Sequence, residues 1–349
     1  MPNNWLERLR EAHKAGEIRG LADFHVHTKE ALGDKFNGAV LASRIVEKAP
    51  NHNVSVFAIT NYHSVKGVQR GLEAAKASEK THVIPGMEII CVYKGMQVHI
   101  VGLGIDHKHP EIVEFEKAVE NAVEVQKHQL RVEIRQFGVA QFLKNHNIPV
   151  KQGASMPSEE ALDKAFKTER QMYPVQGAIN LIHRLGGIAV WAHPPVSRSM
   201  SSKDGDGEAR TLKVDWKKLR STMWEMTEFG LDGMEIGNPL GGSSEKVKDD
   251  CRVKLRGFAE KIQNLPVFKK TGKRVFFLSA GSDEHVFPDK NPNFGKSAHA
   301  VNASFSLPYF FNAIDYVRKH YYVTPAPEQI SASQPMAKKP KPVRRIKGE

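Results

Sequence analysis

Four short apolar segments of this sequence each end at histidine, aspartate or their polar neighbours. They are Leu21–Phe24 before His25 and His27, Val54–Thr60 before Asn61-Tyr62-His63, Ile188–Ala192 before His193, and Arg274–Ser279 before Asp283 and His285. Segments with helical spacing lie between them, and an α/β barrel places its chemistry at the carboxyl ends of its strands. Scattered core histidines are not expected to follow strand ends, so the pattern predicts an α/β barrel with one site at its mouth.

Two histidines in LADFHVHT begin this site. His25 and His27 lie two residues apart, and the two-residue period of a strand points both to the same side. Two imidazoles at this spacing can bind one metal ion, although strand histidines also serve ordinary packing. Two further candidates are Glu88 in PGMEII and His99 in the predicted hairpin 92–103, for which a salt bridge and a core position are the respective alternatives.

The predicted barrel brings these candidates together. The converging ligands are His25, His27, Glu88, His99, His193, Asp283 and His285. They exceed what one ion needs, and Glu88 can bridge two. Imidazole and carboxylate ligands suit divalent zinc, manganese or iron. Such a site favours metal-assisted hydrolysis, because paired ions activate water and stabilise a displacement at phosphorus.

The remaining chain predicts three further segments. An amphipathic helix is expected within 1–18. The predicted phosphoesterase domain extends over 19–325 and includes a helical insert at about 107–185, which interrupts the strand-helix alternation. Residues 331–349 are expected to be disordered, since the part after Ala337 has six Lys or Arg and one Glu. This tail contributes to the formal charge of +12 and can bind nucleic acid or simply increase solubility.

Cysteine content and hydropathy predict a cytoplasmic protein. Cys91 and Cys251 are the only cysteines, too few for a disulfide framework or a thiolate zinc site. No apolar segment approaches the length of a membrane span, and the first residues lack an apolar signal core. The sequence leaves the oligomeric state open.

The motifs that contain these residues resemble those of the PHP (polymerase and histidinol phosphatase) phosphoesterases. In the family's order they are DFHVHT (23–28), AITNYHSVKG (58–67), IPGMEI (84–89), VHIVGLGID (98–106), GGIAVWAHP (186–194), GLDGMEI (230–236) and AGSDEH (280–285). The resemblance implies a distorted (βα)7 TIM-like barrel with two or three metal ions. It implies one ion on His25, His27, Glu88 and Asp283, and a second on Glu88, His99 and His193.

The resemblance is strongest to the branch that includes nucleoside 3',5'-bisphosphate phosphatases and 5'-to-3' exoribonucleases, in which the helical insert is a lid. Arg198 resembles a phosphate-contacting arginine of that branch. Arg131 and Arg135 in the insert are further candidates for a substrate phosphate, the alternative being a solvated helix face.

One motif departs from the family pattern. Family members usually read TDHD where this chain reads Thr60-Asn61-Tyr62-His63, so Tyr62 occupies the position of a third-ion ligand. His63 can replace that ligand through a local shift, or the third site is weak or absent. Glu30 and Asp34 are the candidates for the acidic residue of that site, together with His285.

The sequence therefore predicts a metal-dependent phosphoesterase that acts on nucleotides or nucleic-acid ends, with His285 or His63 assisting proton transfer. Two alternatives stay open at this point. One is an amidohydrolase-type barrel that cleaves C–N bonds, which also uses HxH on its first strand and a late aspartate. The other is a catalytically impaired module that binds nucleic acid.

Overall fold

The computed structural model describes residues 5–32, 39–78, 80–94, 96–146, 148, 156–169, 173–194, 201–202, 213–236, 245–264, 276–283, 294, 301–322 and 324. Three predicted site residues lie outside the described residues, namely Asp34, Arg198 and His285. The predicted basic tail, 331–349, lies outside them as well. Within the described part, none of the helices combines the length and apolarity needed to cross a membrane.

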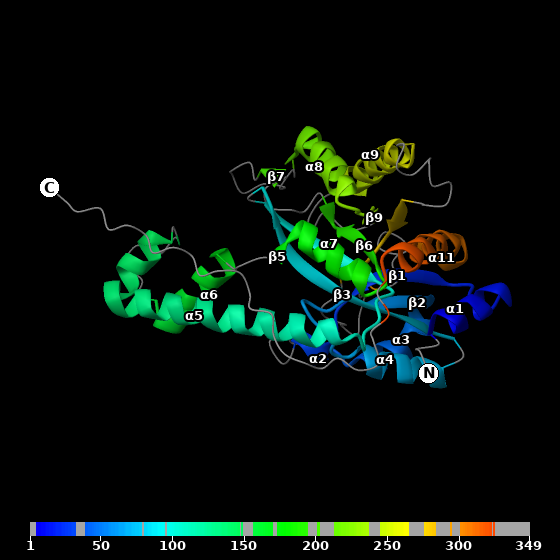
Figure 1. Ribbon diagram of the computed structural model, residues 1–349, viewed down its shortest axis with the longest axis horizontal. Helices are drawn as coiled ribbons and strands as arrows, with labels where there is room; N and C mark the ends of the chain where they lie inside the picture. Colours follow the sequence, from blue (N-terminus) through cyan, green and yellow to red (C-terminus); the bar gives the residue numbers. More distant parts are fainter. Residues whose placement is uncertain are drawn as a thin grey trace.

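A single curled sheet organises the described residues (Figure 1). Its strands are β1 (Leu21–Val26), β2 (Val54–Ile59), β3 (His82–Tyr93), β4 (Met96–Leu103), β5 (Tyr173–Pro174), β6 (Ile188–Ala192), β9 (Gly233–Glu235), β10 (Phe277–Ser279) and β11 (Val301–Asn302). The path runs β10-β9-β6-β4-β3-β2-β1-β11, and β5 pairs with β3. β4 is antiparallel to both β3 and β6, so the predicted hairpin is present. β7 (Ser201–Ser202) and β8 (Lys213–Val214) form a separate antiparallel pair.

The two ends of this path meet at β1. The Phe24 amide donates to the Ala280 carbonyl at 3.0 Å, and the Asp283 amide donates to the His25 carbonyl at 2.9 Å. The segment that follows β10 therefore lies beside the carboxyl half of β1, while β11 pairs with its amino half. This arrangement confirms the mixed α/β fold expected from the sequence, with a sheet that curls toward a barrel.

Side chains along each strand point alternately to the two faces of the sheet. One apolar cluster therefore lies inside the curl of the sheet and two lie outside it. Inner residues such as Phe24, Ile84, Val101 and Phe277 form one apolar cluster with α1 and α11, which close that end of the barrel. Glu88 on β3 and His99 on β4 have the same parity as these inner residues, so their side chains point to the same face. The pairing of β1 with β2 shifts register between Asp23 and Val26. Such an irregularity re-aims side chains beside a functional site.

Helices surround the sheet. They are α1 (Trp5–Lys14), α2 (Lys29–Leu32), α3 (Ala42–Lys48), the 3-10 helix η2 (Ala49–His52), α4 (Val68–Ala77), α5 (Pro110–Asn145), α6 (Ser158–Glu169), α7 (Val175–Arg184), α8 (Trp216–Glu228), α9 (Glu245–Gln263) and α11 (Ala303–His320). Apolar side chains of α7, α8 and α9 pack on one side of the sheet, and those of α3 and α4 pack on another. Figure 1 shows α8 and α9 at the top of the view and α3 and α4 at the bottom.

The predicted insert consists of two parts with different packing. α5 extends away from the strands in Figure 1, bends at Gly138 with φ 71°, and packs against α6 in a small apolar cluster of its own. α7 instead packs into the apolar cluster of β3, β4 and β6. The first turns of α5, with Ile112 and Phe115, pack in that cluster too, so the part that stands apart from the sheet is the later part of α5 with α6, and α7 is a wall helix of the barrel.

Candidate metal centre

The end of β1 begins a dense cluster of imidazoles and carboxylates. The Nε2 atoms of His25 and His27 lie 3.2 Å apart. Oδ1 of Asp283, from the segment after β10, is 3.1 Å from His27 Nε2 and 3.5 Å from His25 Nε2. Oε2 of Glu88 on β3 is 3.4 Å from His25 Nε2 and 3.3 Å from His27 Nε2. These four side chains therefore form one potential ligand group.

The second oxygen of Glu88 faces a different pair of histidines. Glu88 Oε1 lies 2.6 Å from Nδ1 of His99 on β4 and 3.3 Å from Nε2 of His193 at the end of β6. These three residues form a second potential ligand group. Because each oxygen of one buried carboxylate belongs to a different group, Glu88 joins the two groups.

The backbone is bent where two of these ligands leave their strands. His193 has φ 33° and Asp283 has φ 51°, both in the left-handed region that non-glycine residues seldom adopt. Such conformations persist where the surroundings hold them, and they occur often at functional sites. His193 directly follows β6, and Asp283 comes four positions after the end of β10, so each left-handed residue lies where the chain leaves its strand for the cluster.

A buried carboxylate behind the cluster was not among the residues predicted from the sequence. Glu235 on β9 is 1% exposed, and its Oε1 lies 2.8 Å from Nδ1 of His25. Its other oxygen accepts the backbone N–H of His193 at 2.8 Å. A carboxylate that accepts the proton of Nδ1 leaves the lone pair of Nε2 directed at the cluster, as in carboxylate–histidine–metal arrangements. The signal was present in the sequence, since Glu235 in GMEI repeats the apolar context of Glu88 in PGMEI.

Asp23 links β1 to the segment after β10 where the two meet, next to the cluster. Its Oδ1 accepts the amides of His25 at 3.2 Å and Ser282 at 3.0 Å, so it connects β1 to the segment that carries Asp283. Burial raises the pKa of Asp23 to about 7, against the opposing effect of these hydrogen bonds. Asp23 therefore positions the ligands on both sides of it.

The charges of the cluster are mutually dependent. Burial by itself lowers the pKa of His25, but the carboxylates of Glu235, Glu88 and Asp283 raise that pKa well above its ordinary value. The pKa of His27 and of His193 is raised in the same way, against burial, by neighbouring carboxylates. Burial opposes ionisation of Glu88, yet the imidazoles of His99 and His25 hold the pKa of Glu88 well below its usual range. The pKa of Asp283 is lowered likewise, chiefly by His25.

The donor set fits a divalent cation. Glu88 Oε2 accepts no hydrogen bond from the described residues although it is buried between two imidazoles. Two imidazole nitrogens 3.2 Å apart and two carboxylate oxygens all direct lone pairs into the same small volume. Imidazole and carboxylate ligands of this kind bind first-row transition metals and zinc. A cation there would balance the carboxylates and satisfy the otherwise unbonded oxygen.

Tyr62 and His63 have different ring neighbours after the end of β2. The Tyr62 ring lies 4.4 Å from the His27 ring and 6.0 Å from the His99 ring, between centroids, so tyrosine is the side chain that borders both ligand groups. The His63 ring instead packs 6.0 Å from Phe115 of α5. Replacement of the third-ion ligand by His63 stays a prediction.

The remaining predicted residues lie away from the cluster or outside the described part. Both carboxylate oxygens of Glu30 accept the Ala42 amide, at 3.1 and 3.2 Å, and Glu30 also pairs with Arg70 at 3.5 Å. Arg131 lies 3.8 Å from Glu159 of α6. Arg131 and Arg135 follow the first residue of α5 by 21 and 25 positions, which places them about 32 and 38 Å along the helix. The structure does not bring these two arginines to the cluster.

Comparisons with known proteins agree with this geometry. No family model matches the chain. A 5'-3' exoribonuclease of Haemophilus influenzae is 25% identical over 228 residues, which cover 60% of this chain and 79% of that protein. The 5'-3' exoribonuclease Rnm of Escherichia coli is 27% identical over 203 residues, which cover 49% of this chain and 64% of that protein. The chain thus spans slightly less than two thirds of the Escherichia coli relative.

A solved structure supports the fold. A protein of Bifidobacterium adolescentis, named as a candidate metal-dependent phosphoesterase, superimposes with a TM-score of 0.53 and 16% identity, covering 83% of this chain and 96% of that one. The curled α/β barrel and its cluster of histidines and carboxylates define a metal-dependent phosphoesterase. Together with these relatives, the ordered motifs from DFHVHT to AGSDEH support the resemblance of the chain to the PHP phosphoesterases.

Proposed function

We propose that this protein is a 5'-to-3' exoribonuclease that removes nucleotides from the 5' end of RNA. The observation that carries the proposal is that the two carboxylate oxygens of Glu88 belong to two separate ligand groups. Hydrolysis of a phosphodiester is the reaction for which paired divalent ions are most effective. The names of the two bacterial relatives support RNA and 5' polarity.

The ligand assignment follows from the distances. His25, His27, Glu88 and Asp283 would hold one ion, and Glu88, His99 and His193 would hold a second. We propose two divalent ions, taken from zinc, manganese and iron, as the resident set. Bound there, they supply Lewis-acid activation of water and of the phosphoryl group.

The protein's own groups complete the proposed mechanism. Glu235 keeps the Nδ1 proton of His25 in place and anchors the backbone of His193, so both ligand groups are held before substrate arrives. Tyr62 forms the border of the centre beside His27 and His99, where it can contact the scissile nucleotide. His285 or His63 is the proposed proton donor to the leaving oxygen. Arg198 is the proposed contact for a second phosphate of the substrate.

The proposal is tested with purified protein reconstituted in manganese or zinc. The substrates are a 5'-phosphorylated 12-nucleotide RNA, the matching DNA, a nucleoside 3',5'-bisphosphate and p-nitrophenyl phosphate. We expect mononucleotides to appear from the 5' end of the RNA, and His25→Ala to abolish their release while the exposed His320→Ala does not. Internal cleavage, or turnover of the bisphosphate alone, would refute the exonuclease. Absence of turnover on every phosphoester would favour the impaired nucleic-acid-binding module.

The number of ions has a separate test in Tyr62→His. If tyrosine alone excludes a third ion, the histidine variant should bind one more equivalent of manganese than the wild-type protein, measured by elemental analysis after gel filtration. Tyr62→Phe is the matched control and should keep the wild-type count. An unchanged count in Tyr62→His would contradict the account of Tyr62 as the residue that limits the centre to two ions.

A further inference from the structure

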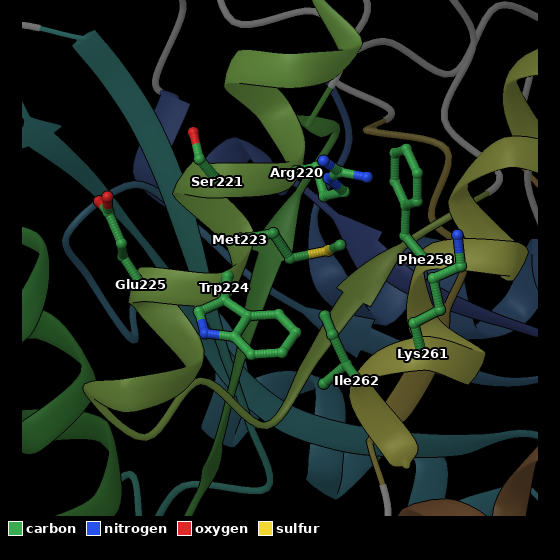
Figure 2. Close-up of a pocket in the computed structure, with 8 residues that line it drawn as sticks. All are labelled: Arg220, Ser221, Met223, Trp224, Glu225, Phe258, Lys261 and Ile262. Atoms are coloured by element: carbon green, nitrogen blue, oxygen red, sulfur yellow. The ribbon is translucent and has the colours of Figure 1, made fainter. Parts of the chain in front are cut away.

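A second recess lies apart from the metal centre, between helices α8 and α9. It is a groove of about 430 Å³ lined by Arg220, Ser221, Met223, Trp224, Glu225, Phe258, Lys261 and Ile262. Figure 2 shows Trp224 and Arg220 on the α8 side and Phe258 and Lys261 on the α9 side. Met223 and Ile262 are each 1% exposed and form its apolar floor. None of the metal-centre residues lines this groove.

Aromatic and cationic side chains alternate along α8. Trp216, Arg220 and Trp224 are spaced by four residues, so they follow one another along a single face of the helix. Arg220 is exposed, and Trp224 is 43% exposed, an unusual fraction for a tryptophan. Trp216 and Trp224 are about 12 Å apart along the helix axis, from eight residues at 1.5 Å each.

The facing side of α9 repeats this pattern. Lys254, Phe258 and Lys261 are spaced by four and three residues, again along one face. The Phe258 ring lies 5.9 Å from the ring of Trp216, and Lys254 Nζ lies 4.9 Å from the centre of that same ring. The two helices therefore present aromatic rings and cations to one another across the groove.

The groove has an excess of positive charge. Its one carboxylate, Glu225, is directed away from Phe258 in Figure 2 and is bound by Lys94 Nζ at 2.8 Å and by the Tyr93 hydroxyl. Within the described part of the chain, Arg220 and Lys261 have no ion-pair partner. Two cations that form no ion pair within the described residues, beside the exposed ring of Trp224 and the half-buried ring of Phe258, complement a chain of alternating phosphates and bases.

We propose that the groove between α8 and α9 is an accessory site for single-stranded RNA, in which bases stack on Trp224 and Phe258 and phosphates pair with Arg220 and Lys261. The occupant would be the downstream part of the strand whose 5' end lies in the metal centre, so this identification rests on the proposed function. α8 connects the parallel strands β6 and β9, and it therefore runs antiparallel to them. Trp216 thus lies toward the barrel end that carries His193 and Glu235, and the aromatic row extends from there.

Binding is measured separately from hydrolysis. The probe is a 12-nucleotide single-stranded RNA with a 3' fluorescein, titrated by fluorescence anisotropy in EDTA so that no cleavage occurs. Arg220→Glu/Lys261→Glu should weaken binding at least tenfold and reduce the slope of log affinity against log salt by about 1.4, from two phosphates at about 0.7 each. Lys76→Glu/Lys80→Glu makes the same charge change on and after α4, and should weaken binding much less.

Base stacking has its own variants. Trp224→Ala should weaken RNA binding about tenfold, whereas Trp224→Phe should retain most of it, because a base still finds an aromatic face. Tyr309→Ala, which removes a side chain that is 45% exposed on α11, is the matched control and should bind like the wild type. Melting temperatures within a few degrees of the wild type show that the variants are folded.

The readouts distinguish this site from the exonuclease itself. All groove variants should hydrolyse the small diester p-nitrophenyl thymidine 5'-phosphate at the wild-type rate and show a raised KM only for the 12-nucleotide RNA. Groove-dependent RNA binding without any hydrolysis would refute the exonuclease and keep the groove. RNA affinity equal in wild type, Trp224→Ala and Arg220→Glu/Lys261→Glu would refute the groove, as would loss of a dimer rather than of RNA binding in these variants.

Discussion

The two ligand groups that share Glu88 differ in burial and support. His25 and His27 are fully buried, and Glu235 holds the outer nitrogen of His25. The side chains of His99 and His193 are 14% and 12% exposed, and Gln97 on the same strand contacts the outer nitrogen of His99 at 2.8 Å. The two histidines of the first group are thus more enclosed than those of the second, while the Asp283 side chain of the first group is 29% exposed. We infer that the first group retains its ion firmly, while the second faces the substrate and exchanges its ion more readily.

Removal of the shared carboxylate tests this comparison most severely. Glu88→Gln keeps the shape of the side chain but removes the charge that serves both groups, so both ions should be lost. Bound ions stabilise the transition state by several kcal/mol, so their loss should lower kcat/KM about 10³-fold. Metal analysis and RNA hydrolysis on the same sample measure both effects. Full metal content in Glu88→Gln would show that the two groups do not depend on this carboxylate.

Removal of one ligand from the second group should separate the two sites. His99→Ala is expected to lose about one equivalent of metal and to retain the other, with kcat/KM reduced about 10²-fold because one of two ions remains. The companion variant Gln97→Ala removes only the neighbouring amide and should keep both equivalents. Loss of both ions from His99→Ala would mean that the groups are not independent.

Weakening the support of the first group should have a more moderate effect. Glu235→Gln removes the carboxylate behind His25 and should lower metal affinity about 10- to 100-fold, as expected for a partner one step behind the ligands. The reduction should appear in titrations with a chelator before it appears in kcat at saturating metal. Equal affinity in the variant and the wild type would exclude Glu235 as a positioning residue for His25.

The smallest effect concerns pH and is measured on metal-free protein. The pKa values of Glu88 and Asp283 are lowered in the fold, so their stabilising contribution is present above about pH 4 and is lost as pH falls further. The pKa values of His25, His27 and His193 are raised, so their contribution is present below about pH 6.5 and is lost as pH rises through the raised values.

These opposite signs predict a stability maximum between about pH 4 and 6.5 for the metal-free protein, measured by urea denaturation across the pH range. Bound metal requires neutral imidazoles and should move that maximum upward. A metal-free protein most stable above pH 8 would contradict the network of charged histidines and carboxylates.

The sequence predicted the metal-ligand candidates from their place on or after apolar strands. It did not predict Glu235, whose role depends on its three-dimensional neighbours. His25, His27, His193 and Asp283 were predicted from strand ends, and Glu88 and His99 from their place within apolar segments. The structure brings all six together. Glu235 was passed over because a short apolar strand gives no sign that its carboxylate lies behind His25, 210 positions away. The burial of an acid in GMEI was the available signal.

Two other features depended on local backbone geometry. Residue type alone does not specify how Tyr62 and His63 lie after β2. Tyr62 forms a backbone bridge with Glu88, and His63 has φ 50°. The aromatic and cationic row of α8 is visible in the sequence, but its counterpart on α9 begins at Lys254, 30 positions after Trp224. Only the fold brings the two rows face to face. The role of the insert as a lid stays a prediction.

The most direct measurement for the metal centre is anomalous X-ray diffraction from crystals of the manganese-loaded protein. We expect one anomalous peak within coordinating distance of His25, His27, Glu88 and Asp283, and a second beside Glu88, His99 and His193, with the first retaining higher occupancy after brief chelation. Absence of both peaks, or manganese bound elsewhere in the molecule, would contradict the two-ion centre on which the proposed activity depends.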